Sequence, residues 1–216
     1  MLNFLLIIGY ILLGYSIKNL SFTPAKLAHY LNKFVIYISL PSLILLQIPK
    51  LDLSLGVYIP IVVAWVTMAL SAVVIWLVSK RLGFTREVTG ALMLVAVLTN
   101  SSFVGIPVIT AYFGDASLPY IIIYDQLGTF LALSTYGTII AAYYSAKSEM
   151  SLKLISTKIA LFPPFMTLVT AFLIQDITFY PLVTQVLEVL AWTIIPFALV
   201  AVGLQMQFKL PSDELT

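Results

Sequence analysis

Four consecutive polar residues interrupt a long apolar stretch of this sequence. Residues 99–102 read Thr-Asn-Ser-Ser, and Gly105 and Pro107 follow them within the apolar run 88–113. Proline lacks a backbone N–H and clashes with the preceding turn, and glycine lowers helix stability, so we expect a helix to break or unwind at Gly105 and Pro107. Irregular backbone at membrane depth must be buried in protein or line a cavity that contains water. Secondary transporters place their substrate sites in such positions.

The residue types of this stretch suit the recognition of an anion. The half-helix that begins after a break presents free N–H groups and a partial positive charge. Asn100 adds an amide with two donors and one acceptor, and Ser101 and Ser102 add hydroxyls. We therefore predict that Asn100, Ser101, Ser102, Gly105 and Pro107 form a substrate-binding site. From the residues alone, a second interpretation stays open: these side chains only cap backbone groups freed by Pro107 in a kinked packing helix.

A second candidate, Asp125 with Gln126, lies in the apolar run 119–145. An ionisable residue within a membrane segment is a candidate functional residue. We predict that Asp125 and Gln126 take part in proton coupling. The alternative follows from position: Asp125 is only six residues after Pro119, about 9 Å along a helix axis. It would then lie at the outer membrane surface, in contact with water.

Membrane helices must position these residues, because the composition is that of an all-α integral membrane protein. Of the 216 residues, 61% are hydrophobic and only 9% are charged, and the mean hydropathy is +1.07. A spanning helix needs about 20 mostly apolar residues. We identify seven such runs and predict seven transmembrane helices, at residues 2–17, 34–48, 57–79, 88–113, 119–145, 159–175 and 180–207.

The basic residues are distributed unevenly between the loops that join these runs. Ten of the eleven Lys and Arg residues lie in alternate loops, and the opposite loops hold only Lys50. Cytoplasmic loops collect Lys and Arg, so we predict an outside N-terminus and an inside C-terminus. The predicted location is the cell membrane, which the chain crosses several times.

An internal repeat is indicated by two prolines, Pro41 in the second run and Pro196 in the seventh. They are 155 residues apart, and the apolar patterns around them match. We interpret both as helix kinks. The helices that precede them enter the membrane from opposite sides, as an inverted repeat of five helices requires. The chain would then hold a first five-helix repeat and two helices of an inverted second repeat.

In the polar segment at residues 100–107 and in the two prolines of the repeat, the chain resembles the auxin efflux carrier family of membrane permeases. This family belongs to the larger group that includes bile-acid/sodium symporter-like transporters. The segment Asn-x-x-x-x-Gly-x-Pro at residues 100–107 is the specific part of the resemblance. The remaining residues that carry it are Leu40, Pro41, Gly114, Asp115, Pro196, Gly203 and Leu204.

The resemblance implies a secondary active transporter, a permease or efflux carrier for small organic anions such as carboxylates or auxin-like acids. It implies ten helices in two inverted repeats, with the broken fourth helices crossing at the substrate site. Helices 1, 2, 6 and 7 would form a scaffold, often a homodimer. Accordingly we divide the chain into scaffold residues 1–50, half of a transport domain at 51–146 and scaffold residues 147–216. The second crossing helix has no counterpart in this sequence.

The composition also allows functions other than transport. The alternative is a membrane scaffold that does not transport, or a channel or assembly subunit. An intramembrane enzyme needs a nucleophile with its base, paired acids or a metal cluster. Because the sequence has one His and no Cys, we expect no enzyme, no cofactor and no metal site. The net charge of +2 gives no indication of a nucleic-acid partner.

Overall fold

The computed structural model describes residues 2–20, 23–50, 55–144, 152–174, 177 and 179–207, and every regular element within them is helical. The all-helical fold is therefore confirmed, while the count of seven crossings and their orientation stay predictions. Four helical stretches are long and apolar enough to span a membrane, at Leu27–Lys50, Tyr58–Leu82, Asp115–Tyr144 and Pro181–Gln205. Three shorter apolar helices accompany them, at Leu5–Ile17, Ser101–Phe113 and Pro163–Leu173.

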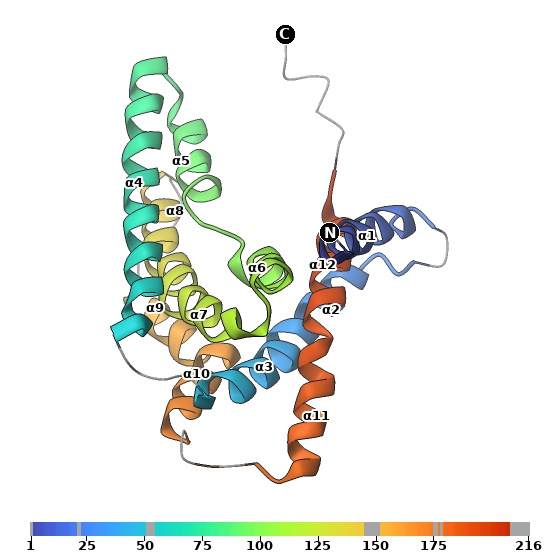
Figure 1. The fold of residues 1–216 in the computed structure, drawn as a ribbon. Coiled ribbons are helices and arrows are strands. Elements are labelled where there is room, and N and C mark those ends of the chain that lie inside the picture. Colours follow the sequence, from blue (N-terminus) through green and yellow to red (C-terminus); the bar gives the residue numbers. More distant parts are fainter. Residues whose placement is uncertain are drawn as a thin grey trace.

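The first group of helices is built around close contact between α1 and α12. A Cβ atom added to Gly14 of α1 would lie 2.2 Å from the carbonyl oxygen of Val200 in α12. One added to Gly203 would lie 2.1 Å from the carbonyl oxygen of Ile11. Such glycines let helix backbones approach closely. The helices of this group (Figure 1) are α1 Leu2–Ile17, α2 Leu27–Phe34, α3 Leu40–Gln47, α10 Pro163–Leu173, α11 Pro181–Trp192 and α12 Ile194–Gln205.

Irregular helix geometry accompanies both repeat prolines. A π-helical segment, Val35–Ser39, joins α2 to α3, and Pro41 lies in the first turn of α3. Pro196 lies in the first turn of α12, directly after a turn at Thr193. Pro41 lies inside the continuous helical stretch Leu27–Lys50, where the π-helical segment before it compensates for the missing N–H group. Pro196 follows the turn at Thr193, and the first N–H groups of a helix lack intrahelical partners. The hydroxyls of Ser39 and Thr193 are 2.6 Å apart and share a hydrogen bond, which joins the two bends.

The second group of helices contains α4, α5, α7 and α8, which lie side by side in Figure 1. A Cβ atom on Gly128 would lie 2.4 Å from the Cβ of Ala64 in α4, and one on Gly90 would lie 2.6 Å from the Cβ of Tyr144. Both glycines therefore allow close helix packing. The bounds of the helices outside the first group are α4 Tyr58–Leu82, α5 Arg86–Val95, α6 Ile106–Phe113, α7 Leu118–Ile123, α8 Thr138–Tyr144 and α9 Leu152–Ala160.

Helix α6 lies between the two groups, where Figure 1 shows it end-on. It contacts α7 on one side and α1 and α12 on the other. The first group falls within residues 1–50 and 147–216, and the second within 51–146. The division into scaffold and transport segments stays a prediction. Movement of one group against the other stays a prediction.

Candidate functional site

The helix expected over residues 88–113 is broken, but not at the predicted position. Helix α5 ends at Val95, residues 96–100 are not helical, and the chain becomes helical again from residue 101. Gly105 and Pro107 therefore lie within the second half-helix, Ser101–Phe113, rather than in the break, and the predicted position of the break is wrong. Pro107 is accommodated because it directly follows a π-helical segment, Ser101–Gly105, and such a local change in winding compensates for the missing N–H group.

Asn100 closes the break as the N-cap of the second half-helix. Its side-chain oxygen accepts a hydrogen bond from the backbone N–H of Phe103, with an N···O distance of 3.3 Å. The Asn100 backbone oxygen also accepts bonds from Val104 and Gly105, at 3.3 and 3.1 Å. Capping residues of this kind satisfy N–H groups that have no partner within the helix. Asn100 therefore has a structural role as a cap, and its role in substrate binding stays a prediction.

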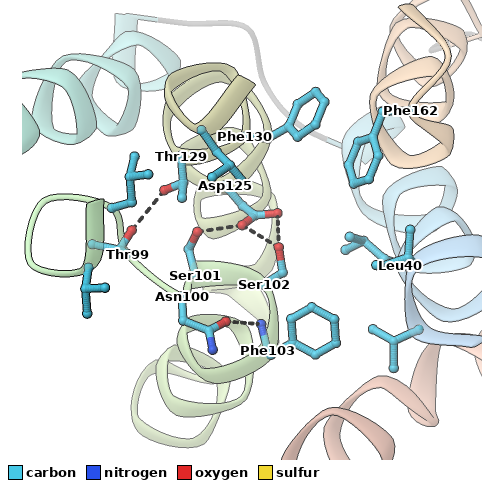
Figure 2. Close-up of a pocket in the computed structure, with 15 residues that line it drawn as sticks. Leu40, Thr99, Asn100, Ser101, Ser102, Phe103, Asp125, Thr129, Phe130 and Phe162 are labelled. Carbon is cyan, nitrogen blue, oxygen red and sulfur yellow. Dashed lines mark hydrogen bonds between the residues drawn. The ribbon is translucent and has the colours of Figure 1, made fainter. Parts of the chain in front are cut away.

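The carboxylate of Asp125 lies beside the start of this half-helix and is only 2% exposed. The Ser101 hydroxyl donates to its Oδ1 atom at 2.5 Å, and the Ser102 hydroxyl donates to Oδ1 at 2.7 Å and to Oδ2 at 2.8 Å (Figure 2). The Gln126 amide donates to Oδ2 at 2.6 Å. Asp125 therefore faces the protein interior, and the alternative of a water-exposed position is wrong.

The hydrogen-bond donors around Asp125 are all neutral. Of the described residues that line the adjacent cavity, none is a Lys or an Arg. A buried carboxylate without a cation is unfavourable unless hydrogen bonds satisfy both oxygens or a proton neutralises it. The two serines and Gln126 satisfy both oxygens of the ionised form. After protonation, the same hydroxyls can accept a bond from the carboxylic acid.

A cavity of about 490 Å³ adjoins this network. It falls within the usual size range of small-molecule sites. One end is polar and the remaining wall is apolar. The rings of Phe130 and Phe162 stack in that wall, with centroids 4.0 Å apart and planes inclined by 14°. The lining residues are Val35, Ile36, Leu40, Val95, Leu98, Thr99, Asn100, Ser101, Ser102, Phe103, Asp125, Thr129, Phe130, Leu133 and Phe162.

The structure brings four of the predicted site residues, Asn100, Ser101, Ser102 and Asp125, together at the polar end of this cavity. Figure 2 shows the two serine hydroxyls directed at the carboxylate and the Asn100 amide on the Phe103 side. The serines therefore bind Asp125 and do not cap the backbone. A site role is compatible with this geometry and stays a prediction.

Three predicted residues do not line this cavity. Gln126 is fully buried behind Asp125, and its side-chain oxygen has no hydrogen-bond partner. Gly105 packs against Ser101, whose Cβ would lie 3.4 Å from an added Cβ. Pro107 lines a different cavity, of about 360 Å³, beside α1 and α12. Any role of Gly105 and Pro107 in substrate binding would be through backbone shape rather than direct contact.

Sequence reasoning did not assign Thr129, Phe130 and Phe162 to the site. The hydroxyl of Thr129 lies 3.0 Å from that of Thr99 and joins the two sides of the polar end. Thr129 and Phe130 follow Asp125 by four and five residues, about one helical turn, so helix periodicity was the available signal. Phe162 precedes the Pro163-Pro164 pair that starts α10. Such a pair marks a turn or loop between helices, and this was the available signal for Phe162.

Comparison with known proteins gives consistent matches to transporters. A family model described as a membrane transport protein matches residues 1–213. An uncharacterized transporter of Methanothermobacter thermautotrophicus is 31% identical over 208 residues, which are 92% of this chain and 65% of that protein. Another from Methanocaldococcus jannaschii is 27% identical over 215 residues, 95% of this chain and 68% of that protein. The chain thus spans less than two thirds of the first relative's length.

Proposed function

Because the chain belongs to the membrane transport protein family, we propose that it is a secondary active transporter that moves small organic anions across the cell membrane. The observation that supports this proposal is the two-part cavity at the broken helix. Ser101, Ser102 and Asp125 form its polar end, and aliphatic and aromatic side chains form its wall. A carboxylate with an apolar or aromatic body has the same two parts. We assign no catalytic reaction to this site.

The proposed coupling depends on the position of Asp125. The half-helix that starts at Ser101 favours an anion at its N-terminal end, and the Asp125 carboxylate lies at that end, where it accepts hydrogen bonds from Ser101 and Ser102. A second carboxylate beside an ionised Asp125 would be repelled, because like charges close together are unfavourable in a dry site. A proton on Asp125 removes this repulsion. Proton and anion therefore bind together, and anion affinity falls as the pH rises.

We further propose that the second group of helices, together with the half-helix Ser101–Phe113, carries this site while the first group stays fixed. The α1–α12 contact through Gly14 and Gly203 suits a rigid scaffold, because the two backbones are too close to slide past each other freely. The cavity lies where the groups meet, with Leu40 on one side and Phe130 on the other. A homodimer through α1, α2, α3, α10, α11 and α12 is part of this proposal.

Uptake into liposomes tests the proposal. The purified chain is reconstituted, and uptake of radiolabelled acetate, benzoate and indole acetate is followed with and without an inward proton gradient. We expect uptake of at least one acid that saturates with concentration and increases with the gradient. Uptake that rises linearly with concentration would indicate the channel alternative, and no uptake of any acid would favour a scaffold or assembly subunit.

Two variants test the site itself. Ser102→Ala removes a hydroxyl that lines the cavity and donates to both Asp125 oxygens. We expect apparent affinity to fall at least about tenfold, because this hydroxyl can donate to the bound carboxylate once Asp125 is protonated, and a hydrogen bond to a charged group contributes about 1.5–3 kcal/mol. Ser156→Ala is the matched control, since this exposed serine on α9 donates only to the Lys153 carbonyl. Equal uptake by both variants would exclude the proposed site.

A further inference from the structure

A second cavity lies where basic residues collect, at the C-terminal end of α4 and the start of α5. Its volume is about 310 Å³, and α8 closes its third side. The predicted orientation places this end at the cytoplasmic membrane surface. The site around Asp125 shares none of its residues. The residues that matter for its chemistry are Trp76, Ser79, Lys80, Arg86, Thr89 and Tyr143.

Two cations enter this cavity, each placed on an aromatic ring. The Lys80 ammonium lies 5.3 Å from the centre of the Trp76 ring. The Arg86 guanidinium lies 5.2 Å from the centre of the Tyr143 ring and also donates to the Tyr143 carbonyl oxygen. Among the described residues that line the cavity, none is an Asp or a Glu. The neighbouring acid, Glu87, is exposed to solvent and outside the lining. The cavity therefore has a local excess of positive charge.

Ser79 provides an independent indication of a ligand. Its side chain is only 4% exposed and lines the cavity, yet its hydroxyl has no hydrogen-bond partner. Serine within a helix commonly donates to the carbonyl four residues earlier. Thr89, across the cavity, does so by donating to the Thr85 carbonyl at 2.9 Å. A buried unpaired hydroxyl is unfavourable, so an acceptor between the two cations would complete the site.

We propose that this cavity binds a phosphate group and that the phosphate belongs to the headgroup of an anionic phospholipid. Phosphate oxygens accept hydrogen bonds and pair with Lys and Arg side chains. The lipid source is supported by the surface below the cavity, where α4 exposes Val73 and Leu77 by 54% and 51%. Acyl chains would lie on this apolar face, with Trp76 at the level of the headgroup. Basic pockets between helices on the cytoplasmic side bind such headgroups.

Native mass spectrometry of the full chain in detergent tests this inference, and it requires no transport activity. Phosphatidylglycerol and phosphatidylcholine are added separately at equal concentration. We expect preferential retention of one phosphatidylglycerol. The variants Lys80→Gln, Arg86→Gln and Ser79→Ala should each weaken this binding, about tenfold for the loss of one charged contact. Lys80→Gln leaves the contact between Arg86 and Tyr143 intact, so it provides a test even where Arg86→Gln fails to fold.

Arg81→Gln is the matched control, because it removes the same charge from the same turn of α4 at a residue that does not line the cavity. An equal loss of binding in Arg81→Gln and Lys80→Gln would overturn the proposed site, as would equal retention of the two lipids. Inorganic phosphate is the third arm of the experiment. Displacement of the lipid by phosphate at the lipid's own concentration, with the same dependence on Lys80, would show that the acyl chains add nothing to binding and would overturn the lipid as the source of the phosphate.

Discussion

Replacing Asp125 by alanine and by asparagine separates the charge of this residue from its hydrogen bonds. Both substitutions remove the carboxylate charge, so a difference in stability between them reports the hydrogen bonds together with the space that the smaller alanine side chain leaves. Alanine leaves the donors of Ser101, Ser102 and Gln126 without their acceptor. Asparagine keeps one oxygen for the two serines. Its amide group can donate to the Gln126 oxygen once the Gln126 amide turns over, so one Gln126 group is unpaired in the asparagine variant and both are unpaired in the alanine variant.

The size of the difference follows from the burial of these donors. Ser101 and Gln126 are buried, whereas Ser102 is partly exposed in the cavity. Each buried donor left unpaired destabilises the fold by about 1–3 kcal/mol. The alanine variant should therefore be less stable than the asparagine variant by about 2–6 kcal/mol. For a chain of this size, the unfolding temperatures should differ by roughly 5–20 °C.

Thermal unfolding in detergent, followed by tryptophan fluorescence without added acid, measures this difference. Asp115→Asn is the control for charge, because Asp115 is exposed in the turn after α6. We expect it to change stability by less than about 0.5 kcal/mol. Equal unfolding temperatures for the alanine and asparagine variants of Asp125 would refute the hydrogen-bond network.

The asparagine variant should also bind acids with an affinity that no longer changes with pH, and a retained pH dependence would contradict proton coupling at Asp125.

Two other predictions concern the packing of the scaffold and the cavity wall. Gly14→Ala places a methyl group 2.2 Å from the carbonyl oxygen of Val200 and should destabilise the folded chain by about 1–3 kcal/mol. Gly9→Ala is the control, because its methyl group meets nothing within 4 Å. This second variant should be neutral or stabilising by up to about 1 kcal/mol. Thermal unfolding compares them, and equal midpoints would contradict the close α1–α12 contact. Phe162→Ala removes the ring stacked on Phe130 and should weaken benzoate uptake several-fold while leaving acetate uptake unchanged. A similar loss for both acids would argue against an aromatic wall that contacts the substrate.

Hydropathy predicted where the helices lie, because each apolar run is a local property of the sequence. Every one of the seven runs contains helix in the described residues. Lipid gives backbone groups no hydrogen-bond partners, so long apolar segments have to form helices. The end of α4 has a similarly local cause: Gly83 follows it with a φ of +67°, a conformation that glycine adopts readily.

The position of the break and the partner of its hydroxyls could not be predicted in the same way. A proline can end a helix, or it can lie within one beside a π-helical segment, and the sequence does not show which of the two applies to Pro107. Ser101 and Asp125 are separated by 24 residues, and no periodic pattern links them. Their contact depends on how the Asp115–Tyr144 helix packs beside the break. This packing places Asp125 in the protein interior and not at the outer membrane surface.

The neutral surroundings of Asp125 have a consequence for the energy source of the proposed transport. The described residues that line the cavity contain no Lys or Arg to balance the charge of a bound acid. Under the proposed coupling, one proton enters with each monovalent anion, so the loaded site carries the same net charge as the empty site with Asp125 ionised. The charge of the rest of the protein does not change during transport. The site therefore moves across the membrane with the same net charge in both directions, and each transport cycle is electroneutral. A voltage across the membrane would neither drive nor oppose such a cycle, and a pH difference alone would drive it.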